Sequence, residues 1–231
     1  MRLLSVDADP ETTRGRCRNV LTGILYLAPA EEAGIGNVCP KASPGCRAAC
    51  LYTAGRAGFT PSIVEARIRK TRELFADREK FFDTLSRDIR NLRIKAVRQG
   101  LLPAVRLNGT FDLPWLAHEM AERHPETQLY DYTKIPRPWE RVRENYDLTF
   151  SLSELNREDA KMALNHGIRV AVVFDTKKGQ PLPKRWEGIP VIDGNLYDAR
   201  FLDPKDVVVG LRAKGKAIRS VSGFVQAAEA Q

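Results

Sequence analysis

Three cysteines lie close together near the start of the chain. Cys39, Cys46 and Cys50 fall within twelve residues, in the segment CPKASPGCRAAC. Thiolates gathered on one loop usually bind a metal ion or a metal cluster. Three ligands rather than four leave one metal position open for a substrate, a cofactor or water, so this group indicates chemistry. The remaining cysteine, Cys17, has no assigned role.

A second group of polar residues follows the segments that we expect to form strands. In parallel α/β folds the residues that do chemistry collect at the carboxyl ends of the strands. Taken singly, such residues also have structural interpretations, since Asp112 and Asn156 would serve as helix caps and Asp193-Gly194 as a turn. Together they predict a rim of hydrogen-bonding groups facing the cysteines: Asn108, Thr110, Asp112, Asp131, Thr133, Lys134, Ser151, Ser153, Glu154, Asp175 and Asp193.

Two helices are expected after the cysteine loop. Thr60 followed by Pro61 is typical of an N-cap with proline at the first helical position, and this helix should end near Phe75. Asp77 is expected to cap the second helix, which Gly100 stops. The apolar residues of the second helix recur every three or four positions, as in an amphipathic helix: Phe81, Leu85, Ile89, Leu92 and Ala96.

Seven short apolar segments predict strands. They are residues 22–29, 103–107, 128–132, 147–152, 169–174, 190–192 and 207–211, with shorter helices expected at 112–124, 138–144 and 156–166. Strands at this spacing predict a parallel sheet, because parallel neighbours need crossover connections. The fold class is therefore α/β, either an open doubly wound sheet or a partial or complete (β/α) barrel. No G-x-G-x-x-G turn follows the first strand, so we favour the barrel, with the cysteine loop after its first strand.

Length and composition predict a single domain. The 231 residues, of which 43% are hydrophobic, can form one substantial core. We divide this domain into the first strand and cysteine loop (1–60), the alternating helices and strands (61–211) and a C-terminal extension (212–231). No apolar stretch of 18 or more residues occurs, and the N-terminal segment turns polar before any signal-peptide core develops. A soluble, cytoplasmic protein without membrane contact is expected.

Positive charge is concentrated beside the cysteines. The formal net charge is +8, and residues 39–72 contain seven Lys or Arg against the single acidic residue Glu65. Such a field attracts anions, whether nucleic-acid phosphates, an anionic cofactor or an anionic metal–thiolate cluster. An ordinary basic surface is the simpler interpretation. Aromatic residues do not alternate with the basic ones, so nothing indicates a stacking platform for single strands.

Several motifs together resemble a known family. CPKASPGCRAACLYTAGR, RLNGTFD, LYDYTK, LTFSLSELN, VAVVF, VIDG and RFLDP occur in this order, and the chain resembles the bacteriophage gene product 88 family over residues 39–211. More distantly, the cysteine loop is similar to that of radical S-adenosylmethionine (SAM) proteins. In that superfamily three cysteines follow the first strand of a (β/α)6 barrel and bind a [4Fe–4S] cluster, whose fourth iron chelates SAM.

The resemblance to radical SAM proteins implies roles for particular residues. Cys39, Cys46 and Cys50 would be the cluster ligands. The cofactor-binding residues would be Asn108, Gly109 and Thr110 at the methionine amino group, Ser151 and Ser153 at the ribose, and Asp112, Asp131 and Asp175 elsewhere on the polar rim. The sequence also departs from the superfamily pattern. Its spacing is C-x6-C-x3-C instead of C-x3-C-x2-C, Ala49 stands where an aromatic residue is common, and no Gly-Gly-Glu motif occurs.

The function implied by this resemblance is that of an iron–sulfur enzyme. Electron transfer from a reducing donor into bound SAM would generate a 5′-deoxyadenosyl radical, and the radical would abstract hydrogen from a substrate. Lys134 and Glu154 are the residues that we expect to act on the substrate side. The substrate could be a nucleic acid, a nucleotide or a small metabolite. A phage-encoded protein would work in the host-cell cytoplasm.

The alternative is a phage nucleic-acid-binding protein with a structural zinc site and no catalysis. Zinc prefers four tetrahedral ligands, so Cys17 or a histidine would have to complete the set. His118 and His124 are six residues apart and do not share a helix face well, and His166 precedes a helix-stopping glycine. The spacing also lacks the paired C-x2-C knuckles of zinc modules. A redox or purely structural cysteine site in a non-catalytic phage protein is a third interpretation.

Overall fold

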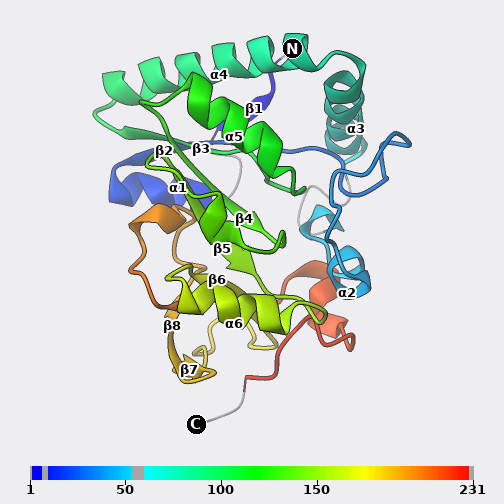
Figure 1. Ribbon diagram of the computed structural model, residues 1–231, viewed down its shortest axis with the longest axis vertical. Coiled ribbons are helices and arrows are strands. Elements are labelled where there is room, and N and C mark those ends of the chain that lie inside the picture. Colours follow the sequence, from blue (N-terminus) through cyan, green and yellow to red (C-terminus); the bar gives the residue numbers. More distant parts are fainter. Residues whose placement is uncertain (1, 7–9, 54–59, 229–231) are drawn as a thin grey trace.

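A mostly parallel sheet forms the centre of the protein. The computed structural model describes residues 2–6, 10–53 and 60–228. Within these residues the sheet has nine strands in the order β1-β2-β3-β4-β5-β6-β9-β8-β7 (Figure 1). The strands are β1 (Leu4–Val6), β2 (Val20–Leu25), β3 (Leu102–Arg106), β4 (Gln128–Thr133), β5 (Tyr146–Ser151), β6 (Val170–Phe174), β7 (Arg185–Trp186), β8 (Ile189–Asp193) and β9 (Val208–Arg212).

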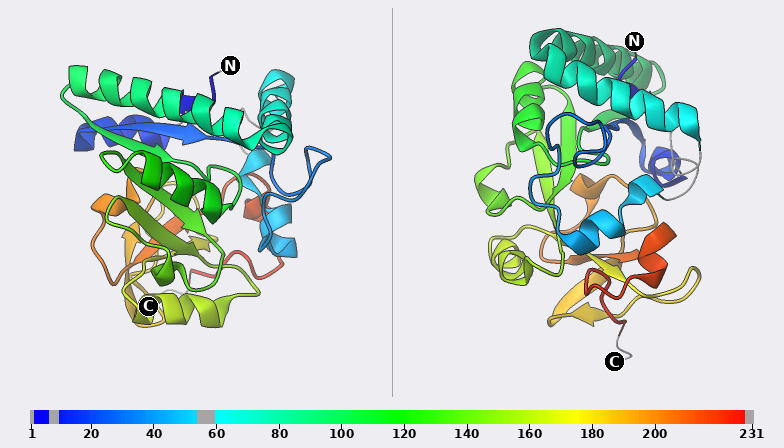
Figure 2. Two further views of the ribbon diagram at one scale, coloured as in Figure 1. Left: turned by 45° about the horizontal axis from the view of Figure 1, so that its top comes forward. Right: turned by 90° about the vertical axis from the view of Figure 1, so that its right-hand side faces the viewer.

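Helices connect the parallel strands and cover one face of the sheet. α4 packs on β2 and β3, α5 on β4, and α6 on β5 and β6; Figures 1 and 2 show α4 lying along the outside of the molecule. The α-helices are α1 (Pro10–Gly15), α2 (Pro44–Ala48), α3 (Pro61–Ala76), α4 (Arg78–Arg98), α5 (Pro114–Arg123) and α6 (Arg157–Asn165). The short 3-10 helices are η1 (Arg16–Arg18), η2 (Leu51–Thr53), η4 (Pro138–Glu140), η5 (Arg200–Leu202) and η6 (Gly215–Arg219).

The two helices expected after the cysteine loop are confirmed. Asp77 caps α4, because its side chain accepts a hydrogen bond from the backbone N–H of Lys80 at 3.0 Å. Gly100 ends the turn after α4 with a φ of +66°, a conformation that glycine adopts without strain. The predicted apolar stripe of α4 is buried against the sheet: Phe81, Leu85, Ile89, Leu92 and Ala96. Within the described residues, no helix is long and apolar enough to cross a membrane.

The closed form of the expected barrel is not present, although the mixed α/β fold is confirmed. The sheet is open, and β1 and β7 pair antiparallel at its two edges. β9 lies between β6 and β8 instead of extending the order of the chain, so the first and last parallel strands do not meet. All seven predicted strands exist, but the first spans Val20–Leu25 rather than 22–29, and β1 precedes it.

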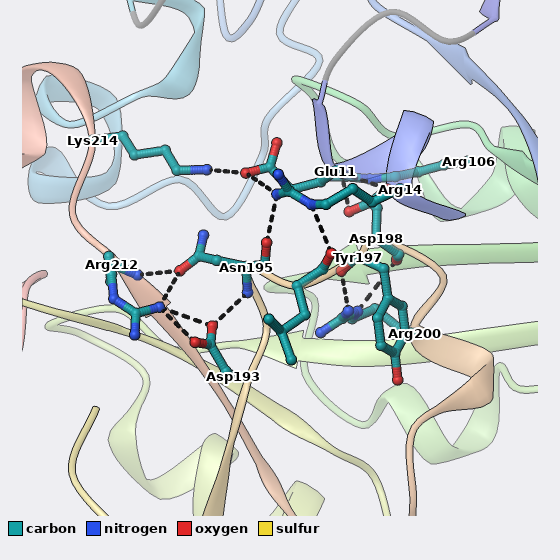
Figure 3. Close-up of polar contacts among 11 residues, drawn as sticks. Glu11, Arg14, Arg106, Asp193, Asn195, Tyr197, Asp198, Arg200, Arg212 and Lys214 are labelled. Carbon is teal, nitrogen blue, oxygen red and sulfur yellow. Dashed lines mark hydrogen bonds and ion pairs between the residues drawn. The ribbon is translucent and has the colours of Figure 1, made fainter. Parts of the chain in front are cut away.

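The sheet face opposite α4 and α5 combines a small apolar cluster of Val20, Ala104, Tyr130 and Ala199 with ion pairs. Arg106 of β3 donates to both carboxylate oxygens of Asp198, at 3.1 and 3.2 Å, and the Tyr130 hydroxyl donates to the same carboxylate at 2.8 Å. Arg200 of η5 is fully buried and pairs with Asp203 at 3.1 Å. Residues 193–203 thus form a polar layer on this face, as Figure 3 shows.

Ionic contacts also attach α1 to this layer. The Arg14 guanidinium donates to the carbonyls of Asn195 and Leu196, at 2.6 and 2.8 Å. Lys214, just after β9, pairs with Glu11 at 2.5 Å (Figure 3). The helix α1 and the end of β9 are therefore held together, although Glu11 and Lys214 are 203 residues apart in sequence.

We expect Ile89→Ala in α4 to lower the free energy of unfolding by about 2–5 kcal/mol, because it leaves a cavity between the helix and the sheet. Val97→Ala is the matched control. Val97 lies on the same helix but is 66% exposed, and its replacement should change stability by less than about 0.5 kcal/mol. Urea unfolding followed by circular dichroism measures both. Equal effects of the two substitutions would contradict the burial of this face.

Candidate metal centre

The cysteine loop leaves the carboxyl end of β2 and forms one short helix. Ser43 begins α2, because its hydroxyl accepts a hydrogen bond from the backbone N–H of Cys46 at 3.1 Å, and Pro44 occupies the first helical position. Cys39 therefore lies before the helix, Cys46 within it and Cys50 after it. The carboxyl ends of β3, β4 and β5 meet at the same edge, because these strands run parallel to β2.

The three thiols are close enough for the charge of one to shift the pKa of another. Cys39 is buried, and its sulfur accepts a hydrogen bond from the backbone N–H of Ala30 at 3.2 Å. Burial raises the pKa of the Cys39 thiol to about 12, and Cys50, Cys46 and Asp112 add to this effect. Burial also raises the pKa of Cys50, to which the charge of Cys46 contributes. In the described part of the chain, however, no group of three or more His, Cys, Asp or Glu side chains is placed to hold a metal ion.

Glu154 anchors the cysteine loop. Its carboxylate accepts hydrogen bonds from the Ser43 hydroxyl at 2.7 Å and from the backbone N–H of Gly45 at 2.6 Å. A Cβ atom added at Gly45 would come within 2.7 Å of this carboxylate, so glycine is needed for the close approach. We predicted Glu154 as a catalytic residue. The structure brings it to the cysteines, with contacts suited to positioning the loop.

Lys134, Ser151 and Asp112 also reach the cysteine loop. Lys134 Nζ donates to the Ser151 hydroxyl at 3.1 Å, and its charge favours the thiolate form of Cys50. Asp112 does not cap α5 as expected. Its carboxylate instead accepts from the Thr133 hydroxyl at 2.9 Å and from the backbone N–H of Lys134 at 2.7 Å. Burial raises the pKa of Asp112 to about 6, against the lowering effect of these hydrogen bonds.

Asn108 and Asp131 form a separate buried pair. Asp131 accepts from the backbone N–H and the side-chain amide of Asn108, at 2.7 and 3.0 Å, and burial raises its pKa to about 7. Asn108 in turn accepts from the backbone N–H of Leu113 at 2.9 Å. At Gly109, an added Cβ would approach the Leu25 carbonyl to 2.7 Å. These residues pack the ends of β2, β3 and β4 together, and their polar groups form hydrogen bonds with one another or with the backbone.

The other predicted rim residues have partners of their own. Thr110 donates through its hydroxyl to the Leu27 carbonyl at 2.6 Å, and its own carbonyl faces the Cys39 sulfur at 3.8 Å. Ser153 is buried, and its backbone N–H donates to Asn156 at 2.6 Å. Asp175 is exposed and accepts from the backbone N–H of Ala228 at 2.8 Å. Asp193 pairs with Arg212 at 2.8 Å, away from the cysteines in the polar layer of Figure 3.

Arg67 is a site residue that the sequence interpretation missed. It projects from α3, is only 7% exposed, and lies over the rings of Tyr26 and Tyr52, at 4.8 and 5.4 Å from their centroids. Its charge favours the thiolate form of Cys50. Nη1 of this guanidinium is buried without a hydrogen-bond partner in the described structure. The available signal was a basic residue on the inward face of a predicted helix, three and seven residues before the buried Lys70 and Leu74.

The C-terminal extension covers the cysteine loop, which the sequence did not indicate. Ala217 and Phe224 pack against Cys46 and Ala49 in a small apolar cluster. Figures 1 and 2 show η6 beside α2 in different views. The Phe224 ring also lies 5.7 Å from Lys134 Nζ. Residues 217–224 therefore contribute to this site together with the cysteine loop.

The residues considered as a fourth zinc ligand lie elsewhere or have other partners. Cys17 is exposed in η1, before β2. The cysteine loop follows β2, whose six residues span about 20 Å. His118 accepts from Arg143 at 3.0 Å, and His166 stacks on Trp139 with ring centroids 3.9 Å apart. His124 is buried at the end of α5.

Comparison with known proteins identifies the family. The family model described as "Gene product 88" matches residues 3–228. No curated protein and no solved structure matches the chain. The radical SAM resemblance is not shown by these comparisons and stays a prediction. Because the family match spans nearly the whole chain and includes the cysteine loop, the protein belongs to the bacteriophage gene product 88 family.

Proposed function

We propose that the protein is an iron–sulfur protein in which Cys39, Cys46 and Cys50 hold a [4Fe–4S] cluster. The observation that carries this proposal is the electrostatic coupling of three thiols with a buried guanidinium that has no acidic partner among the described residues. Charge on Cys46 and Cys50 raises the pKa of Cys39, and the charge of Arg67 favours the thiolate form of Cys50. Ligands of a cluster bind different iron atoms, so they need not converge on one point as the ligands of a single ion do.

The electrostatics of the site fit an anionic metal group. Thiolates are poorly solvated at buried positions and need nearby positive charge. Arg67 and Lys134 supply that charge at Cys50. A buried cation without a counter-ion is itself costly, and a metal–thiolate cluster would balance it. When bound, such a cluster supplies one-electron chemistry and an iron position free of protein ligands, at which SAM could be held.

We further propose that strands β2 to β6 form the partial barrel of a radical-SAM-like enzyme. Support comes from their parallel pairing in chain order and from the cysteine loop that follows the first of them. Asp112, Lys134 and Ser151 would orient the cofactor or substrate, while Glu154 positions the loop. The substrate would be a nucleic acid, a nucleotide or a small metabolite, and the reaction would need a reducing electron donor. We place this activity in the host-cell cytoplasm.

The alternative of a structural zinc site in a non-catalytic nucleic-acid-binding protein needs a fourth ligand. Cys17 lies before β2, and the histidines have other partners or are buried at a helix end. Asp112 is the acidic neighbour of Cys39, and its carboxylate already accepts two hydrogen bonds. The cluster therefore agrees better with the contacts of this site.

Protein purified without oxygen should be brown, with broad absorbance near roughly 400 nm and similar amounts of iron and sulfide. Alanine at Cys39, Cys46 or Cys50 should reduce bound iron to below about one tenth, because each thiolate ligates the cluster. Cys17→Ala is the matched control and should keep the wild-type iron content. Colourless protein with one zinc per chain would instead support the structural zinc site.

Arg67→Met should lower the reduction potential of the cluster by tens of millivolts, because the lost positive charge no longer stabilises the reduced, more negative form. Arg47→Met is the control. Arg47 follows Cys46 directly but is exposed and pairs with Glu31 at 2.6 Å, so solvent screens its charge. Redox titration followed by EPR measures both potentials. An unchanged reduction potential in Arg67→Met would contradict the placement of the Arg67 guanidinium near the cluster.

Addition of SAM should change the EPR spectrum of the reduced cluster, because SAM would bind the iron that lacks a protein ligand. The substitution Lys134→Met should weaken this response and keep the iron content, since Lys134 is placed beside the cluster without ligating it. If the EPR spectrum of the reduced cluster is unchanged by SAM, the radical-SAM-like part of the proposal is refuted. The proposal of a bound cluster is not affected by that result.

A further inference from the structure

The outward side of the C-terminal half of α4 is strongly basic. Its exposed basic residues, which we call the α4 basic face, are Arg87, Arg90, Arg93, Lys95 and Arg98. The one acidic residue in this stretch, Asp88, is turned away from the face. Its carboxylate accepts hydrogen bonds from the backbone N–H groups of Leu3 and Leu4, at 2.5 and 3.1 Å. The face therefore presents positive charge without an acidic residue of its own helix.

Helix geometry places Arg87, Arg90 and Arg98 on the solvent side, with Arg93 and Lys95 on its two flanks. Leu85, Ile89, Leu92 and Ala96 are buried against the sheet. At about 100° per residue, Arg87 and Arg98 project opposite this buried stripe, and they stand about 17 Å apart along the axis. Figures 1 and 2 show α4 on the outside of the molecule. The α4 basic face is thus open along three turns.

The requirements of the fold do not explain this charge. The helix dipole favours basic residues only in the last turn, which holds Lys95 and Arg98. Within the described residues, Arg93 pairs with Glu126 at 3.0 Å, whereas Arg87, Arg90, Lys95 and Arg98 form no ion pair. Like charges spaced three residues apart on a helix repel one another. The positive charge therefore disfavours the isolated fold and calls for an anionic partner.

We propose that the α4 basic face binds the phosphate backbone of double-stranded nucleic acid, independently of base sequence. A row of cations on a straight helix matches the regular charge of a duplex. The row contains no aromatic side chain on which single-stranded bases could stack. The exposed apolar side chains Ile94 and Val97 lie between Arg90, Arg93 and Arg98 on the helix and offer apolar contact between the charges. Ile94 and Val97 are 50% and 66% exposed there.

Neighbouring basic residues extend the surface. Arg16 of η1 donates to Gln99 at 3.4 Å, which brings the basic helix η1 to the end of α4. This end of α4 leads into the start of β3, whereas the cysteine loop follows the carboxyl end of β2. The α4 basic face is therefore remote from the candidate metal centre. The proposal does not depend on a bound cluster.

Fluorescence anisotropy with short labelled duplexes of DNA and of RNA tests the proposal, with salt varied between about 50 and 200 mM. The variant Arg87→Gln/Arg90→Gln/Arg98→Gln removes three exposed charges from the face. The control Lys177→Gln/Lys178→Gln/Lys184→Gln removes three exposed charges from the connection between β6 and β7. Both variants have the same net charge, so a difference between them reports the location of binding.

Wild type and the lysine control should bind duplex with a steep salt dependence. The arginine variant should bind at least about tenfold more weakly at the lowest salt, with a slope of log affinity against log salt shallower by about 2.7, near 0.9 per lost phosphate contact. Preference for DNA or RNA would identify the duplex. Equal binding by the two variants would overturn the proposal. So would binding to anionic lipid vesicles or to single strands without binding to duplex.

Discussion

Half-buried carboxylates that accept hydrogen bonds from distant parts of the chain connect the loops at the edge of the sheet that carries the cysteines. Glu154 joins the end of β5 to Ser43 and Gly45, which are 111 and 109 residues away in sequence. Asp112 joins the loop after β3 to the end of β4. A buried carboxylate without donors would be strongly destabilising, so each loop is fixed in the place where its donors meet the acid. The arrangement of the three cysteines depends on these contacts.

The two faces of the sheet are packed by different physical means. The face under α4 and α5 is closed by apolar side chains from strands and helices. The opposite face adds arginine–aspartate pairs from β3 and from residues 193–203 to a small apolar cluster. Ion pairs need matched geometry, while apolar contacts tolerate some adjustment. The ion pairs therefore fix residues 193–203 on the sheet more specifically than apolar contacts alone would.

Local signals in the sequence predicted the local parts of the structure. α4 was predictable because Asp77, the apolar repeat and Gly100 act within a few residues of one another. The place of β9 between β6 and β8 was not, because strand order depends on partners distant in sequence. The cysteine loop was selected from the spacing of its thiols, and their role as metal ligands stays a prediction. Arg67 was missed because a basic residue in a helix has the same sequence pattern whether it faces solvent or the cysteines. Asp112 was assigned to a nearby helix, whereas its partners are on β4.

The cover over Cys46 has a consequence for biosynthesis. Ala217 and Phe224 pack on the cysteine loop, yet they leave the ribosome after α2 and all nine described strands. A nascent chain that has emerged only as far as α6 presents Cys46 and Ala49 to solvent without this apolar shield. The apolar cover of the cysteine loop therefore forms only after residues 217–224 have been synthesised.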